Sequence, residues 1–441
     1  MTAFKYPRLV LSDPEGRVFD HPSLKIAGRS GNRIVLPPPS ELVPLPRGSQ
    51  IFSLPGRIPV GWDEKGETFS PSEKFRVSGR DKECTAVAAF LPPGYLRTLT
   101  PATRLKAEPH HLPLWAYCAV GWKERRFWAA GILVDPNPHW NPRYFRNDRV
   151  LTERVEAALE KNRENRLLRQ LSRCALEYHC FAAKNVFYGR WECPLPTSPS
   201  CNADCLGCIS LQPSECCPAS QERITFVPTV EEVVEIALPH LKRAEDPIVS
   251  FGQGCEGEPL IQWRLLERSI RGLREKTDQG TINLNTNGSY PERVKRLCKA
   301  GLDSIRVTLN SANPVHFRRY HRPRGFGLEE AVESIIIGRE MEIYTSINLL
   351  VHPGFTDRED EIERLLKLIR KTGLHLIQMR NLNIDPDLYL EEMGEGEGVG
   401  IPRMMEILKK EFPSIQFGYF NRTKEAFYAS KGSESIGRAV K

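Results

Sequence analysis

Apolar and polar residues follow a different rhythm at the start of the chain from the one they follow later. At the start, short runs of apolar and β-branched residues stand between clusters of Pro and Gly, namely Arg8–Leu11, Arg33–Leu36, Thr85–Ala88 and Trp128–Val134. Such runs predict strands, and the clusters between them predict turns. We therefore predict a small β-rich N-terminal domain over residues 1–150.

The next stretch is rich in charged residues, and its apolar residues recur every three or four positions. These apolar residues are Val155, Leu159, Leu167, Leu171, Ala175 and Tyr178. Their spacing places them on one face of a helix, and no Pro or Gly interrupts the stretch. We predict a helical connector over residues 151–185.

From residue 186 onward, strand-like and helix-like segments alternate. Six strand segments, the first near Arg190–Pro196 and the last at Leu376–Asn381, are separated by amphipathic helical segments. This alternation favours an α/β fold with a parallel sheet and crossover helices. We assign residues 186–390 to this α/β domain and residues 391–441 to a C-terminal extension.

Composition decides how the cysteines are interpreted. The 441 residues include 12 cysteines. No run of eighteen apolar residues predicts a membrane span, and the N-terminal sequence lacks the apolar stretch of a secretory signal. The expected compartment is the cytoplasm, where reducing conditions disfavour disulfides and favour metal binding, catalysis or burial of cysteine.

Three cysteines lie close together just after the first strand of the α/β domain. Cys201, Cys205 and Cys208 have the spacing C-x3-C-x2-C, and we call residues 201–208 the cysteine loop. Three thiolates on one tight loop can ligate one cubic iron–sulfur cluster, which leaves its fourth iron without a protein ligand. Such an open position allows a metal centre to bind and activate a small molecule.

A closed zinc site is the alternative interpretation of this loop. The neighbouring Cys193, Cys216 and Cys217 offer a fourth thiolate, and four thiolates complete a structural zinc site. The same three residues are the candidates for any second metal site.

The cysteine spacing and the strand ends that follow it resemble the radical S-adenosylmethionine (SAM) superfamily. After the second strand comes GQGCEGEP at residues 252–259, which looks like the Gly-Gly-Glu motif of the family. The resemblance covers roughly residues 190–386. It implies a partial six-stranded (β/α) barrel that holds a [4Fe–4S] cluster on the cysteine loop and binds SAM.

The resemblance also implies a reaction. In this family the open iron is chelated by SAM, and one electron gives methionine and a 5′-deoxyadenosyl radical that abstracts hydrogen from a substrate. A low-potential electron donor such as flavodoxin or ferredoxin is the implied partner. The residue before the third cysteine is usually aromatic, whereas this chain has Gly207, so we expect another side chain, such as Ile209, to fill that space.

Contacts to SAM are implied on the successive strand ends, and no catalytic side chain is indicated. Glu258 is expected to accept hydrogen bonds from the SAM ammonium group, with Glu256 as the competing carboxylate and Gly254 allowing close backbone approach. The remaining expected contacts are the polar residues Asn287, Arg306, Ser346 and Asn348. Lining of the barrel interior is the alternative role of the arginine.

Three functions fit these observations. The first is a radical SAM enzyme that abstracts hydrogen from an unidentified substrate, with a protein or peptide presented by the N-terminal domain as one candidate. The second is RNA modification, because the net charge is +7 and residues 313–323 combine His, Arg and aromatic side chains, although acids and bases are interspersed along the chain. The third is a non-enzymatic iron–sulfur or zinc protein.

Overall fold

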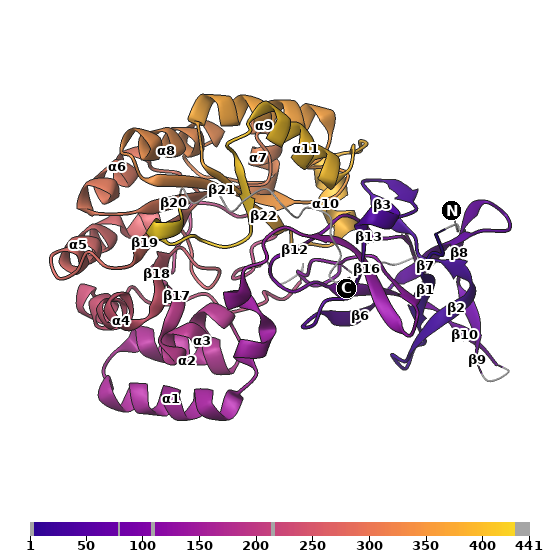
Figure 1. The fold of residues 1–441 in the computed structure, drawn as a ribbon, viewed down its shortest axis with the longest axis horizontal. Coiled ribbons are helices and arrows are strands. Elements are labelled where there is room, and N and C mark those ends of the chain that lie inside the picture. Colours follow the sequence, from indigo (N-terminus) through magenta and orange to yellow (C-terminus); the bar gives the residue numbers. More distant parts are fainter. Residues whose placement is uncertain (1–3, 78–79, 107–110, 213–216, 428–441) are drawn as a thin grey trace.

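The computed structural model describes residues 4–77, 80–106, 111–212 and 217–427. Antiparallel strands form the N-terminal part, three helices follow, and a parallel sheet with flanking helices forms a partial barrel. Figure 1 shows the N-terminal strands at one end of the molecule and the parallel sheet with its helices at the other. Among the described residues, every helix is too short or too polar to cross a lipid bilayer.

The N-terminal part is β-rich, and each of the four predicted runs overlaps a strand. In its eleven-stranded sheet, β1 (Arg8–Ser12) pairs with β2 (Val18–Lys25), β11 (Thr85–Phe90) and β15 (Val120–Lys123). The other strands of this part are β3 (Gly28–Ser30), β4 (Arg33–Val35), β5 (Leu42–Pro44), β6 (Gln50–Leu54), β7 (Arg57–Asp63), β8 (Thr68–Pro71), β9 (Lys74–Val77), β10 (Arg80–Glu83), β12 (Tyr95–Arg97), β13 (Thr100–Pro101), β14 (Thr103–Leu105) and β16 (Arg126–Leu133).

The segment expected to be a helical connector consists of three helices. They are α1 (Asp148–Lys161), α2 (Arg166–Leu176) and α3 (Phe181–Tyr188). The first break lies at Asn165, whose side chain accepts a hydrogen bond from the backbone N–H of Leu168 and so caps α2. An Asn that bonds to the nearby backbone favours the start of a helix over the continuation of one.

Seven parallel strands, hydrogen-bonded in the order of the sequence, form the barrel sheet. They are β17 (Arg190–Pro194), β18 (Glu245–Phe251), β19 (Thr281–Thr286), β20 (Ser304–Leu309), β21 (Tyr344–Val351), β22 (Leu376–Asn381) and β23 (Gln416–Gly418). The helices of this part are α4 (Val230–Arg243), α5 (Trp263–Arg274), α6 (Pro291–Ala300), α7 (Pro314–His321), α8 (Leu328–Glu340), α9 (Glu359–Thr372), α10 (Pro386–Met393) and α11 (Ile401–Glu411).

The predicted partial barrel is confirmed, and it has one strand more than the six predicted. The additional strand, β23, pairs with β22 in parallel. It has only three residues, which is too few for a periodic pattern to indicate a strand in the sequence.

The two faces of the barrel sheet differ in polarity. Side chains on the outer face, such as Val249 and Val307, are fully buried in the largest hydrophobic core together with residues of the helices. The inner face is largely polar: Asn283 lies on it, and the strand register places Arg306 beside Ser346 there. Parallel strands that are packed on both faces are usually apolar throughout, so this alternation marks an inner face built for hydrogen bonding.

The N-terminal strands contact the barrel at the carboxyl ends of its last strands. Arg97 on β12 is fully buried, and its guanidinium donates to the carbonyl of Leu382 at 2.8 Å. The backbone N–H of Arg97 donates to the Asn381 side chain at 2.9 Å. The carboxylate of Asp135 accepts a hydrogen bond from the backbone N–H of Tyr419, just after β23. Active sites of barrel folds lie at this edge, so the N-terminal part borders the candidate site.

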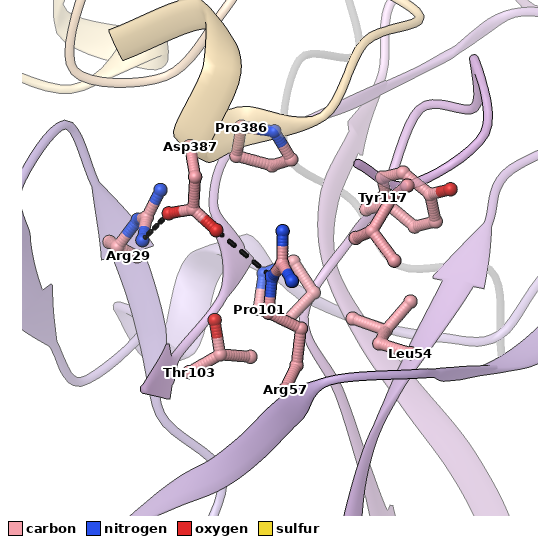
Figure 2. A pocket seen from close by; sticks show the side chains of 9 residues that line it. Arg29, Leu54, Arg57, Pro101, Thr103, Tyr117, Pro386 and Asp387 are labelled. Carbon is pink, nitrogen blue, oxygen red and sulfur yellow. Dashed lines mark hydrogen bonds and ion pairs between the residues drawn. The ribbon is translucent and has the colours of Figure 1, made fainter. Parts of the chain in front are cut away.

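A buried ion pair strengthens this contact at the start of α10. Arg57 Nη2 lies 2.7 Å from Asp385 Oδ2, and Arg57 Nε lies 3.0 Å from Asp387 Oδ2. Figure 2 shows Arg29 and Arg57 converging on the Asp387 carboxylate. The side chains of Arg57 and Asp385 are only 2% and 1% exposed. Because a buried charge without a partner is costly, each of these two charges depends on the other.

Arg57→Met is expected to lower the free energy of unfolding by about 3–5 kcal/mol, because the buried Asp385 carboxylate loses its cation. Denaturant unfolding followed by circular dichroism measures this change. Arg8→Met is the control, since the Arg8–Asp20 pair is 51% and 36% exposed. Exposed pairs contribute about 0–1 kcal/mol. Equal destabilisation by the two substitutions would contradict this role of the buried pair.

Candidate functional site

The cysteine loop follows β17 and is held by the carboxyl end of α7. The backbone N–H groups of Asp204 and Leu206 donate to the carbonyls of His321 and Tyr320, each at 3.0 Å. Carbonyls in the last turn of a helix have no partner within the helix. The loop therefore satisfies the end of α7, while α7 fixes the path of the loop.

The three thiols of the loop are half-buried neighbours. Burial raises the pKa of Cys201 to about 11, and burial and the charges of Cys208 and Cys201 raise the pKa of Cys205 well above its ordinary value. Cys201 and Cys205 therefore ionise together only when bound cations compensate their charge.

Two basic side chains approach the cysteine sulfurs. Arg223 Nη2 lies 3.4 Å from Cys208 Sγ, and Arg223 Nε donates to Ser210 Oγ at 3.2 Å. His321 Nδ1 lies 3.3 Å from Cys205 Sγ. Burial lowers the pKa of His321 to about 3, so this ring is neutral. Hydrogen bonds and charge at ligand sulfurs help to set the reduction potential of an iron–sulfur cluster.

The sequence predicted that Ile209 fills the space beside Gly207. This prediction is wrong, because Tyr320 fills that space. A Cβ atom at position 207 would lie 2.8 Å from Tyr320 Oη. The Tyr320 side chain is 2% exposed. Ile209 instead lies against Gly254, where a Cβ atom would meet its Cδ1 at 2.5 Å. The aromatic ring next to the third cysteine thus comes from α7 and not from the loop.

Glu256 is occupied in joining two loops. Its Oε2 accepts hydrogen bonds from the backbone N–H groups of Thr197 and Ser198, at 2.7 and 3.0 Å. Its Oε1 accepts from those of Gly252 and Gln253, at 2.7 and 2.9 Å. These four donors fill the acceptor sites of the carboxylate, which leaves little capacity for a ligand.

Glu258 retains acceptor capacity. Its Oε1 accepts from the Leu260 N–H and the Thr286 hydroxyl, but its Oε2 accepts one hydrogen bond, from the Asn287 N–H at 2.8 Å. The backbone N–H of Glu258 donates to the carbonyl of Ser200 at 2.8 Å, which holds Glu258 next to the start of the cysteine loop. Burial raises the pKa of Glu258 to about 7, and an adjacent cation favours its ionised form. This geometry favours Glu258 over Glu256 for the SAM ammonium group.

Of the other predicted contacts, Asn287 directly follows β19, and Ser346 and Asn348 lie within β21. Asn287 donates to Asn202 Oδ1 in the cysteine loop at 2.8 Å. Ser346 is buried and donates to a backbone carbonyl of β20. Asn348 Nδ2 donates to Thr308 Oγ1 at 3.3 Å. Their role as SAM contacts stays a prediction.

Arg306 is the third of the six residues of β20, so it lies deeper in the barrel than the carboxyl ends of the strands. Its Nη1 donates to Gln378 Oε1 at 2.6 Å and to Asn421 Oδ1 at 3.2 Å. Burial lowers the pKa of Arg306 to about 9. This position favours the alternative role, lining of the barrel interior.

Several buried polar atoms at the strand ends have no hydrogen-bond partner within the described part of the chain. They include Asn202 Nδ2, Asn285 Nδ2 and Asn348 Oδ1. A buried polar group without a hydrogen bond lowers the stability of the fold by about 1–3 kcal/mol. Such donors and acceptors are therefore expected to pair with a ligand or with water. SAM carries amino, carboxylate, ribose and adenine groups that can pair with them. The residues present therefore fit SAM beside a cluster.

Sequence reasoning missed four side chains of this site. Asn202 lies within the cysteine loop, and a signal existed for Asn285, because it and Asn283 alternate with the apolar residues Ile282 and Leu284. Arg223 and Tyr320 carried no sequence signal for contact with the cysteine loop, since only the fold brings them to it.

The extra cysteines near the loop are separated by the fold. Cys193 is fully buried in the core on the outer face of β17. Cys217 lies in a different hydrophobic cluster, with Leu206 and Leu382. Cys216 lies outside the described residues. Cys193 and Cys217 therefore do not share a metal site.

The fold and the three-cysteine loop define an iron–sulfur enzyme whose site lies at the carboxyl ends of parallel strands. Residues 195–369 match the sequence model of the radical SAM superfamily. This part of the chain is thus similar to the radical SAM superfamily, whose members use a [4Fe–4S] cluster and SAM.

Two curated relatives each match less than half of the chain. The GTP 3′,8-cyclase of Aquifex aeolicus is 28% identical over 203 residues, which cover 45% of this chain and 60% of that protein. The FeMo cofactor biosynthesis protein NifB of Klebsiella pneumoniae is 25% identical over 178 residues, which cover 37% of each chain. The match thus spans less than two thirds of either relative. Among solved structures, methylornithine synthase (PylB) has a TM-score of 0.38 at 13% identity, covering 61% of this chain and 78% of that one.

Glu258→Gln is expected to weaken SAM binding by about tenfold or more, because a charge-assisted hydrogen bond is lost. Glu256→Gln is expected instead to lower the free energy of unfolding by about 2 kcal/mol, since its amide N–H₂ faces backbone donors. Equilibrium dialysis of SAM with the reconstituted enzyme and denaturant unfolding separate the two effects. Loss of SAM binding in a fully stable Glu256→Gln variant would reverse the assignment.

Arg223→Gln is expected to shift the reduction potential of the bound cluster to a more negative value, because a cation no longer stabilises the extra electron. A half-buried charged hydrogen bond worth about 1 kcal/mol changes the ratio of reduced to oxidised cluster roughly fivefold at a fixed potential. Electron paramagnetic resonance during a redox titration measures this ratio. Arg268→Gln, on α5, serves as the control, and an unchanged potential in Arg223→Gln would exclude the effect.

Proposed function

We propose that this chain cleaves SAM reductively at a [4Fe–4S] cluster held by Cys201, Cys205 and Cys208. The observation that carries the proposal is that hydrogen bonds join Ser200 and the cysteine loop that follows it to Glu258 and Asn287, beside amide atoms that have no partner within the described residues. When bound, the [4Fe–4S] cluster and SAM supply one-electron cleavage of the S–C5′ bond of SAM, which gives methionine and a 5′-deoxyadenosyl radical that abstracts a hydrogen atom from the substrate.

The residues of the chain hold and orient the reacting groups. Three thiolates leave one iron free of protein ligands, so SAM has a coordination position. Glu258 accepts hydrogen bonds from the SAM ammonium group through the free site on its Oε2. Arg223 donates a hydrogen bond to the Cys208 sulfur, and the His321 ring lies beside the Cys205 sulfur. The tight loop and its buried supports fix these groups before SAM binds.

The segment that suggested RNA modification serves the cysteine loop. His316 Nδ1 lies 2.6 Å from Glu361 Oε1, and the side chains of Tyr320 and His321 are each 2% exposed. RNA-binding segments present aromatic and basic side chains to solvent, where bases can stack on them. Arg318, Arg319 and Arg322 of this segment are exposed, but its aromatic rings are buried, so the segment offers no ring on which RNA bases could stack. Similarity to an enzyme superfamily argues against the non-enzymatic alternative.

The substrate reaches the site beside the N-terminal part. The contacts of Arg97 and Asp135 place the N-terminal part at the carboxyl ends of β22 and β23. This position suits a role in presenting a protein, a peptide or another large substrate at the mouth of the barrel. Radical SAM enzymes need a reductant, and we propose a low-potential flavodoxin or ferredoxin in the cytoplasm, where reducing conditions preserve the thiols.

Anaerobic reconstitution with iron and sulfide, followed by dithionite and SAM, is expected to yield 5′-deoxyadenosine, which chromatography measures. Cys205→Ala is expected to reduce the yield to background, because two thiolates no longer hold the cluster. Cys298→Ala on α6 is the matched control and is expected to retain activity. A cluster that forms without binding or cleaving SAM would overturn the proposed function.

A further inference from the structure

Solvent reaches the inner face of the sheet at the ends of three neighbouring strands. Most residues of β20, β21 and β22 are buried, and the partly exposed ones are Thr308, Asn348, Leu350, Arg380 and Asn381. The register pairs Thr308 with Asn348 and Leu350 with Arg380, which places these four side chains together on the inner face. A ligand that enters from the carboxyl edge therefore meets this part of the barrel.

An unpaired donor lies at the base of this region. Arg306 is 9% exposed, and its Nη1 is bonded to Gln378 and Asn421. Its Nε has no hydrogen-bond partner within the described residues. A buried guanidinium that lacks a partner on one edge is costly unless a ligand supplies the acceptor.

Arg380 adds a second positive charge beside the first. Arg306 is bonded to Gln378, and Arg380 lies two positions further along β22, so its side chain stands on the same face of the sheet. The Arg380 Cζ atom lies 4.3 Å from the centroid of the Tyr419 ring, and no carboxylate of the described chain forms an ion pair with it. Stacking on a ring leaves the N–H edge of a guanidinium free to bind an acceptor.

One carboxylate faces these two cations without bonding to either. Glu192 on β17 accepts hydrogen bonds from the neutral amides of Asn421 and Gln253, at 2.8 and 3.4 Å. The strands β19–β23, which carry both arginines, contain no acidic residue. The region therefore carries an excess positive charge in a poorly solvated place, which favours an anion.

We propose that the substrate carries an oxyanion, either a carboxylate or a phosphate group, which binds between Arg306 and Arg380. The inference rests on the proposed radical SAM function and makes Arg306 a substrate contact in place of a SAM contact. Planar guanidinium groups bind oxyanions through paired N–H donors, and the burial of this pair strengthens the interaction. Anchored in this way, one end of the substrate is held inside the barrel, which decides which C–H bond faces SAM.

The test is calorimetric titration of the reconstituted enzyme, saturated with SAM and without reductant, at constant ionic strength. Inorganic phosphate and malonate are the two probes, and they distinguish a phosphate from a carboxylate group. We expect saturable binding of at least one probe, weakened about tenfold or more in Arg380→Gln. Arg264→Gln is the matched control, because Arg264 also stacks on an aromatic ring, with its Cζ 4.5 Å from the Trp263 centroid, but on the outer helix α5.

Arg306→Lys is the second variant, since it keeps the charge but loses the paired donors, and it is expected to weaken the probe and not SAM. The inference is overturned if the wild type binds neither probe or if Arg380→Gln binds as tightly as the wild type. It is also overturned if the affinity for SAM falls by the same factor, because the pair would then hold SAM. If 5′-deoxyadenosine forms but no anion binds, only this inference is contradicted. If an anion binds but no 5′-deoxyadenosine forms, only the proposed function is contradicted.

Discussion

The site depends on one buried carboxylate that joins two loops of the barrel. Glu256 is 5% exposed, and its four backbone hydrogen bonds come from Thr197 and Ser198 on one side and from Gly252 and Gln253 on the other. The first two residues lead into the cysteine loop, and the second two follow β18. Parallel strands bring these loops to the same edge of the sheet, but a separation suited to a cluster and SAM requires a fixed link. A carboxylate that is fully bonded to backbone supplies that link without depending on flexible side chains.

The cysteine loop lies between two supports that come from distant parts of the chain. The end of α7 accepts hydrogen bonds from the loop, and its Tyr320 fills the space beside Gly207. On the other side, Leu382 packs in the same hydrophobic cluster as Leu114 from the N-terminal part. Arg97 ties the Leu382 carbonyl to that part as well. The N-terminal strands therefore help to position the loop, and any role in presenting a substrate is additional to this structural one.

The polar side chains on the inner face of the barrel lower the stability of the fold but can bind ligands. Asn285, Arg306 and Asn348 each leave a buried polar atom unpaired within the described chain, and apolar residues at these positions would remove that cost. The outer face of the same strands is closely packed and apolar, and it compensates for the cost. A single sheet thus carries the hydrophobic core on one side and the groups that meet ligands on the other, as expected when function is placed on a rigid scaffold.

The sequence by itself determined the class of protein and the order of its elements. The spacing of the cysteine loop needs only adjacent residues, and the alternation of strands and helices is a local periodicity, so both are readable without a structure. Only the tertiary structure decided that Glu256 joins loops while Glu258 keeps a free acceptor site, because the donors to both come from other loops. The same is true of Arg223 beside Cys208 and of Tyr320 beside the loop. Contacts between residues far apart in the chain leave no spacing or periodicity in one sequence, and they are set by how the elements pack.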